Sequence, residues 1–353
     1  MIFFISPGLQ IDIGREKTNR LTITARERLL AYVDHDNLNT QLASVNATYV
    51  YDAQSRLSAK ITGSFEQASQ NDNTSSGNFT DDFIIERNYY RAGVLLDYKL
   101  TDKSLFEAGF NYDGEFFVTE RARFNDRQTY SVPVSWLYSA WEKLFIGMTY
   151  TYSHTDIRKA GWQKNWVPTL TNPNPDADPG SQDVHFIGLS VRGPLSEKIS
   201  LSANAGVGYQ DFRKRSDWLG GSESGTTFNF SVAAEYSPTE RLSTKLEAGR
   251  RFDVGSEAQG ITNTFFHLNA NYYINQRWQV GGDIGFSYQS FDNAAWYGVS
   301  RTDEIFTAGL DLTFLPTKYW RFNVGYSYVN NHSNYDWAHY SINRVRFSAS
   351  LKY

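Results

Sequence analysis

The strongest constraint on the fold is an alternation of apolar and polar side chains with a period of two residues. In residues 344–353, one side of an extended chain would carry Val345, Phe347, Ala349, Leu351 and Tyr353, and the other only arginine, serine and lysine. A period of two places alternate residues on opposite faces of a β-strand. Because residues 199–210 and 278–288 repeat the pattern, the chain is predicted to be all-β, with strands that are apolar on one face only.

Composition limits how such strands can be used. The 353-residue chain has 23 Tyr and 24 Phe but only 9 Pro, and its mean hydropathy is -0.50. No apolar run approaches the roughly 18 residues that a membrane helix needs, whereas a β-barrel can span a membrane with alternate residues alone. The chain has no cysteine, which excludes disulfides and thiolate metal sites. The net charge of -4 argues against a nucleic-acid-binding protein.

The connections between the expected strands are sorted by length. Short polar turns such as 101–103 and 275–277 alternate with long polar loops such as 71–82 and 157–183. Transmembrane β-barrels show this sorting, with short periplasmic turns and long outer loops. A large soluble antiparallel barrel or sandwich is the alternative, since its core face would be equally apolar. We predict one transmembrane antiparallel β-barrel domain over residues 1–353, with about 18 strands and a range of 16–18.

The strand count has a consequence for closure. Seventeen strands can be read from the sequence if residues 2–13 form the first, and the first and last strands would then run in the same direction. Bacterial single-chain barrels close with an even number of strands, so we expect one further strand before Met1. The residues after Met1 also lack the basic segment and long apolar run of a signal peptide, so an exported chain would have lost its signal.

Two charged residues, Glu27 and Arg250, fall on the expected lipid side, where mid-membrane charges are costly. We therefore expect a β-bulge near each, which would reset the alternation.

The polar faces of the strands are predicted to line a lumen. At this strand number the interior is wide enough to hold water rather than a packed core. Both signs of charge occur, so no strong ion preference follows, and the favoured interpretation of each charge is a solvated wall residue paired across strands rather than a specific substrate contact. The candidate pore-lining residues are Arg26, Arg28, Lys60, Arg91, Glu107, Arg192, Glu235, Lys245, Glu247, Asp283, Asp311, Arg344 and Arg346.

The longest loop, residues 156–183, contains Trp162 and Trp166. Loops of this length are functional or disordered in most proteins. Three hypotheses are open: a constriction folded into the pore, a surface cap whose tryptophans stack on sugars, or an exposed polar loop.

The N-terminal region carries a family resemblance. The stretch Phe-Ile-Ser-Pro-Gly-Leu-Gln-Ile at residues 4–11, followed by 19–23, 32–34 and 38–39, resembles the start of the β-barrel porin 2 family, which includes outer-membrane proteins encoded in exopolysaccharide and capsule operons. The last strand, closed by Tyr353, resembles the signal strand that the barrel-insertion machinery reads. The resemblance implies a bacterial outer-membrane location with a periplasmic C-terminus. It implies lipid, lipopolysaccharide, the insertion machinery, polysaccharide and periplasmic export components as partners, and no catalytic residue or cofactor.

We therefore expect a water-filled conduit, for exopolysaccharide export or for passive diffusion of solutes. One alternative is a non-conducting scaffold barrel that anchors envelope partners. Another is an outer-membrane hydrolase assembled from residues distant in sequence. The sequence has no Gly-x-Ser-x-Gly, His-Glu-x-x-His or phosphate-loop motif, so we expect no enzymatic activity.

Overall fold

The computed structural model describes residues 2–14, 18–32, 39–52, 56–69, 86–118, 126–141, 143–157, 181–213, 224–254, 260–291 and 300–351. These residues form 18 β-strands and one short 3₁₀ helix. The elements are β1 (Ile2–Ile5), β2 (Gly8–Ile13), β3 (Asn19–Tyr32), β4 (Thr40–Asp52), β5 (Leu57–Ser69), β6 (Glu86–Thr101), β7 (Ser104–Phe117), β8 (Arg127–Trp141), β9 (Leu144–Ile157), β10 (Ser181–Ser196), β11 (Ile199–Arg213), β12 (Ser224–Thr239), β13 (Leu242–Val254), β14 (Gly260–Tyr273), β15 (Trp278–Phe291), β16 (Arg301–Phe314), β17 (Trp320–Ser333), η5 (Asp336–Ala338) and β18 (Tyr340–Leu351).

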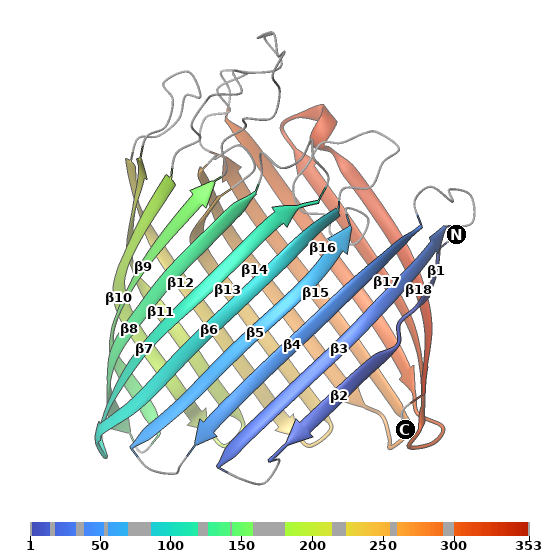
Figure 1. Ribbon diagram of the computed structural model, residues 1–353, viewed down its shortest axis with the longest axis horizontal. Coiled ribbons are helices and arrows are strands. Elements are labelled where there is room, and N and C mark those ends of the chain that lie inside the picture. The colour runs from blue at the N-terminus through green and yellow to red at the C-terminus, as the bar shows by residue number, and fades with distance from the viewer. Residues whose placement is uncertain are drawn as a thin grey trace.

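The strands form one antiparallel meander. From β3 to β18 each strand pairs with the next one in the chain, and the tilted strands curve into a barrel (Figure 1). Tight turns join strands at the end of the barrel where the C-terminus lies, which we call the turn end; the opposite end is the loop end. Polar side chains close these turns, as where Asn275 Oδ1 accepts hydrogen bonds from the backbone N–H groups of Arg277 and Trp278. The predicted all-β antiparallel barrel is confirmed.

β1 and β2 are two parts of one strand. Ile5 lies opposite Leu29 and Gly8 lies opposite Arg26, so both pieces hold the same register on β3. The break between them contains Pro7, whose carbonyl accepts a 3.0 Å hydrogen bond from the backbone N–H of Glu27. Proline has no backbone N–H with which to donate a hydrogen bond in return, and strands that contain it are edge strands as a rule. The 18 strands therefore occupy 17 positions around the barrel, the number predicted from the sequence.

The two ends of the meander are edges. The ladders join β1 and β2 to β3 and β18 to β17, and within the described residues no register pairs β18 with β1 or β2. Every residue of β2 is exposed, on both faces of the strand. Because 17 antiparallel positions alternate in direction, β18 runs the same way as β1 and β2. The further strand expected from the sequence lies outside the described residues and stays a prediction.

The apolar face is the outer one. Its residues are exposed along the strands, as Val207, Ile284 and Leu310 illustrate. Aromatic pairs lie toward both ends of this face: Tyr112 with Tyr130 toward the loop end, and Trp278 with Phe314 at the turn end. An exposed apolar band flanked by aromatic residues is typical of a lipid-facing barrel surface. The soluble alternative would bury the same residues. In the described part of the chain, no helix is long and apolar enough to cross a membrane.

The expected β-bulges at Glu27 and Arg250 are absent from the structure. The β3–β4 ladder runs through Glu27, and the β13–β14 ladder runs through Arg250, without a shift in register. Both side chains stay on the outer face. Glu27 accepts a hydrogen bond from Gln41 on the neighbouring strand, and Arg250 is the last residue at which β13 pairs with β12. The prediction was wrong because a hydrogen-bonding neighbour, or the end of the pairing with one adjacent strand, can accommodate an outward charge without any change in register.

Candidate functional site

The predicted pore-lining residues occupy the face of each strand opposite the exposed apolar residues. They come from strands all around the barrel: Arg26 and Arg28 from β3, Lys60 from β5, Arg91 from β6, Glu107 from β7, Arg192 from β10, Glu235 from β12, Lys245 and Glu247 from β13, Asp283 from β15, Asp311 from β16, and Arg344 and Arg346 from β18. They therefore form a ring of wall charges rather than one compact site.

Several of these charges pair along the wall. Arg91 lies between Glu66 and Asp113, at 3.8 and 3.5 Å, while Lys245 Nζ is 2.6 Å from Glu247 Oε1. Such pairing keeps the local charge of the wall small.

Longer side chains bridge strands that are not neighbours. Arg192 of β10 forms an ion pair with Glu107 of β7, and Arg346 of β18 reaches Asp311 of β16 at 3.2 Å. These ion pairs run along the inner wall. The strands that they join, β7 with β10 and β16 with β18, are not hydrogen-bonded to each other in the described sheet.

The charged side chains on the inner wall are exposed to solvent. The side chains of Arg91, Lys245 and Arg346 are 53%, 50% and 55% exposed, although they point away from the outer surface. All described strands lie in the wall, and η5 packs against the end of β17. Water therefore reaches the interior at these positions, and no described element crosses the lumen.

Hydroxyl groups form a row on the inner face, closer to the turn end than to the loop end. Ser135 Oγ lies 2.8 Å from Thr149 Oγ1, which lies 2.5 Å from Ser190 Oγ. The row thus spans β8, β9 and β10. Hydroxyls can donate or accept hydrogen bonds, so such a wall suits both water and hydroxylated solutes.

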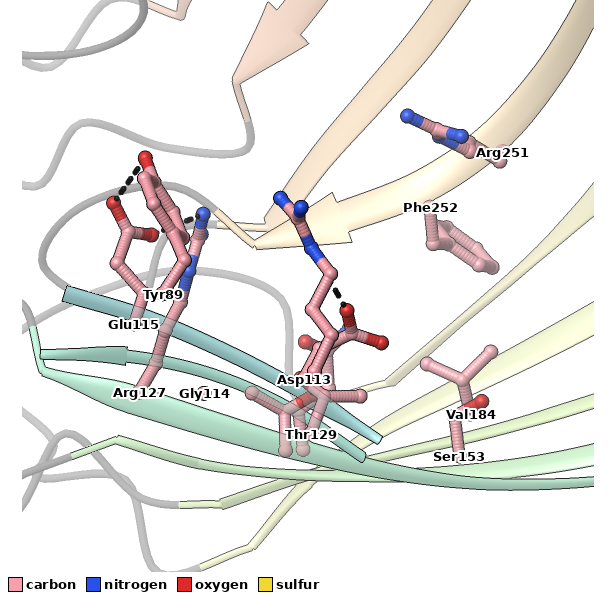
Figure 2. A pocket seen from close by; sticks show the side chains of 13 residues that line it. Tyr89, Asp113, Gly114, Glu115, Arg127, Thr129, Ser153, Val184, Arg251 and Phe252 are labelled. Atoms are coloured by element: carbon pink, nitrogen blue, oxygen red, sulfur yellow. Dashed lines mark hydrogen bonds and ion pairs between the residues drawn. The ribbon is translucent and has the colours of Figure 1, made fainter. Parts of the chain in front are cut away.

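A cavity of about 520 Å³ opens on the inner face near the loop end (Figure 2). Strands β6 to β10 form one side, and two residues of β13 form the other. Its lining residues are Tyr89, Arg91, Asp113, Gly114, Glu115, Arg127, Thr129, Ser153, Thr155, Gln182, Val184, Arg251 and Phe252. Of these, Arg91 is one of the candidate pore-lining residues, and the alternation of the sequence also places Asp113 and Arg251 on the inner face.

Glu115 organises one side of this cavity. Its carboxylate accepts hydrogen bonds from Arg87 Nη1 at 2.8 Å and from the Tyr89 hydroxyl at 3.1 Å, and Arg127 Nη2 lies 2.8 Å away. Arg87 and Glu115 are only 4% and 7% exposed. Alternation from Arg91 and Asp113 places these residues on the inner face, so the signal was present, but a buried cluster at the strand ends is not visible in the pattern.

Other sequence hypotheses are not placed by the structure. Trp162 and Trp166 lie in residues 158–180, outside the described residues, so the loop hypotheses stay predictions. Among the described residues, no group of three or more histidine or acidic side chains is arranged to hold a metal ion.

No protein-family model matches the sequence, and no curated protein matches it either. Solved structures match it in fold. The copper transporter OprC aligns with a TM-score of 0.50 and 8% identity, over 99% of this chain and 64% of that chain. The FrpB iron transporter from Neisseria meningitidis gives 0.48 and 9%, over 96% and 61%. The ferric-catecholate import receptor Fiu from E. coli K12 gives 0.46 and 9%, over 94% and 63%. This chain thus spans less than two thirds of each, and the likeness concerns the barrel fold alone.

Proposed function

We propose that this chain is a bacterial outer-membrane barrel that provides a water-filled conduit across the membrane. The observation that carries the proposal is the half-exposed state of the inward charges Arg91, Lys245 and Arg346. A packed or plugged interior would bury these side chains. Passage is passive, and pore width and wall charge set its selectivity.

The wall chemistry supports weak selectivity between small ions. Lys245 and Glu247, and Arg346 and Asp311, place opposite charges within a few ångströms of each other. Paired charges largely cancel at the distance of an ion in the middle of the lumen. The hydroxyl row from Ser135 to Ser190 adds neutral hydrogen-bonding groups that do not discriminate between anions and cations.

Orientation and cargo form the finer part of the proposal. We place the loop end outside the cell and the C-terminus in the periplasm, where bacterial barrels have their short turns. Lipid and lipopolysaccharide surround the barrel, which the insertion machinery assembles. The cargo is exopolysaccharide or its fragments, delivered by periplasmic export components. The resemblance of residues 4–39 to the β-barrel porin 2 family and the hydroxyl-rich inner wall support this cargo. Passive diffusion of small solutes is the alternative.

Conductance in a planar bilayer tests the conduit. Purified, folded protein is expected to give ohmic current steps with a reversal potential near zero in a gradient of potassium chloride. Heat-modifiable migration on gels verifies that the sample is folded. A folded sample without conductance would contradict the conduit and favour a scaffold barrel.

A further inference from the structure

The wall of the barrel opens between β12 and β13 near the loop end. The two strands pair from Thr239 and Leu242 up to Phe230 and Arg250. Beyond this point β12 continues to Ser224, paired with β11 only, and β13 continues to Val254, paired with β14 only. The last four residues of β13, 251–254, therefore have no backbone pairing with β12 but remain paired with β14.

The freed end of β13 turns toward the lumen. Phe252 would face outward if the alternation of β13 held, yet it lines the inner cavity together with Arg251. Figure 2 shows both residues across the cavity from Tyr89, Glu115 and Arg127. The end of β13 thus faces the wall that β6 to β10 build.

Small and amide residues make room for this displacement. A Cβ atom at Gly208 of β11 would lie 3.3 Å from Phe252 Cε2, so the phenyl ring reaches across β12 toward β11. Asn229 of β12 lies in between, only 8% exposed, and its Oδ1 has no hydrogen-bond partner in the described structure. On the far side, the Arg251 guanidinium lies 5.2 Å from the centre of the Phe265 ring of β14. The displaced segment is therefore packed on both flanks.

We propose that Arg251 and Phe252 form the constriction of the conduit at its outer mouth. This inference rests on the proposed conduit function and names the residues that set its selectivity. Phe252 limits the width of the mouth, and Arg251 adds a positive charge that raises the local concentration of anions. The opposing surface includes Ser153, Gln182 and Val184 and, farther along β6 to β8, the charged residues around Glu115. Passing solutes therefore meet a phenyl ring and a guanidinium on one side, and a mixed surface of polar, charged and aliphatic side chains on the other.

Single-channel recording of two matched pairs of variants tests the constriction. Phe252→Ala is expected to enlarge the current step and to admit larger polyethylene glycols, whereas Phe266→Ala removes a phenyl ring from the outer face and should leave both unchanged. Arg251→Gln is expected to shift the reversal potential toward cation preference. Its neighbour Arg250 lies on the outer face, so Arg250→Gln should not produce that shift.

A cross-link gives a second readout in a chain that has no native cysteine. The double variant Val184→Cys and Phe252→Cys is expected to lose conductance when a reducible bifunctional thiol reagent links the two cysteines, and to regain it on reduction. Heat-modifiable migration on gels verifies folding of every variant. If wild-type protein conducts but Phe252→Ala and Arg251→Gln behave as wild type, the constriction is wrong and the conduit stands. If folded wild-type protein does not conduct, the conduit itself is wrong.

Discussion

Arg87 donates a 2.8 Å hydrogen bond to Glu115, and both side chains are buried at the loop end of the barrel. Breaking a buried pair by removing one charge costs about 3–5 kcal/mol, because the other charge is left without compensation. Arg127 and Tyr89 also contact Glu115, so this carboxylate is the centre of the cluster. The cluster joins β6, β7 and β8 on the inner face near the loop end.

We therefore expect Glu115→Gln to lower the free energy of unfolding by about 3 kcal/mol, within the range for a broken buried pair. Urea unfolding in detergent or lipid would measure it. Arg91→Gln is the matched control: Arg91 lies on the same inner face but is half exposed, and exposed pairs contribute about 0–1 kcal/mol. Equal losses for the two variants would show that burial of the Glu115 cluster does not stabilise the barrel.

The alternation of the strands predicts which positions face water. In β11, Ser202 and Asn204 belong to the inner face, and Leu201 and Ala203 to the outer face. With cysteine introduced singly at each position, a water-soluble thiol reagent is expected to label positions 202 and 204 in intact membranes and to spare 201 and 203. Equal labelling of both sets would contradict a lipid-facing outer surface.

Charge on the outer face gives an independent test of the same surface. Ile284→Arg places a charge in the exposed apolar band and is expected to cost about 2–4 kcal/mol if it lies near the middle of the membrane. Ser287→Arg, on the inner face of the same strand, should cost much less because the lumen is wet. Urea unfolding in lipid bilayers distinguishes the two outcomes.

Substituting alanine for glycine is expected to have opposite effects on stability at two positions of the barrel. A Cβ atom at Gly147 would lie only 1.9 Å from the Trp136 carbonyl oxygen, and this oxygen belongs to the backbone. We expect Gly147→Ala to cost about 1–3 kcal/mol, as overpacking does. At Gly63 nothing lies within 4 Å of a new Cβ, so Gly63→Ala is expected to be neutral or to stabilise by up to about 1 kcal/mol. Unfolding free energies measured side by side would contradict this prediction if both variants changed alike.

The sequence predicted the parts of this fold that depend on alternation. Strands β11 and β15 and the inner position of Arg91 follow from a period of two, because lipid and water face opposite sides of each strand. The Glu115 cluster did not follow, since its partners come from three strands whose relative heights are set by pairing register. The inward turn of Phe252 was also missed, because the separation of β13 from β12 breaks the alternation where a sequence reading assumes that it continues.

The last prediction concerns the two edges of the meander. β18 and β2 run in the same direction, and no register pairs them in the described part of the chain. Unpaired backbone groups in lipid cost several kcal/mol each, so a barrel in a membrane cannot leave both edges open. A single strand antiparallel to both would satisfy them, and the expected strand before Met1 has that direction. In other copies of this chain inserted in the same orientation, the edge strands β2 and β18 run in this same direction. A second copy therefore cannot supply the antiparallel strand.

Disulfide trapping in the product of the intact gene tests this prediction. Neighbouring strands lie about 4.8 Å apart, and a disulfide needs Cβ atoms about 3.5–4.5 Å apart. Cysteines at Gln10 and Thr24, which lie opposite each other on β2 and β3, are the positive control and should cross-link on mild oxidation. Gln10→Cys combined in turn with cysteine at Arg344, Arg346 or Ser348 of β18 should not cross-link, because an intervening strand doubles the separation. A cross-link between β2 and β18 as efficient as the control would show that the two edges pair directly and that no further strand closes the barrel.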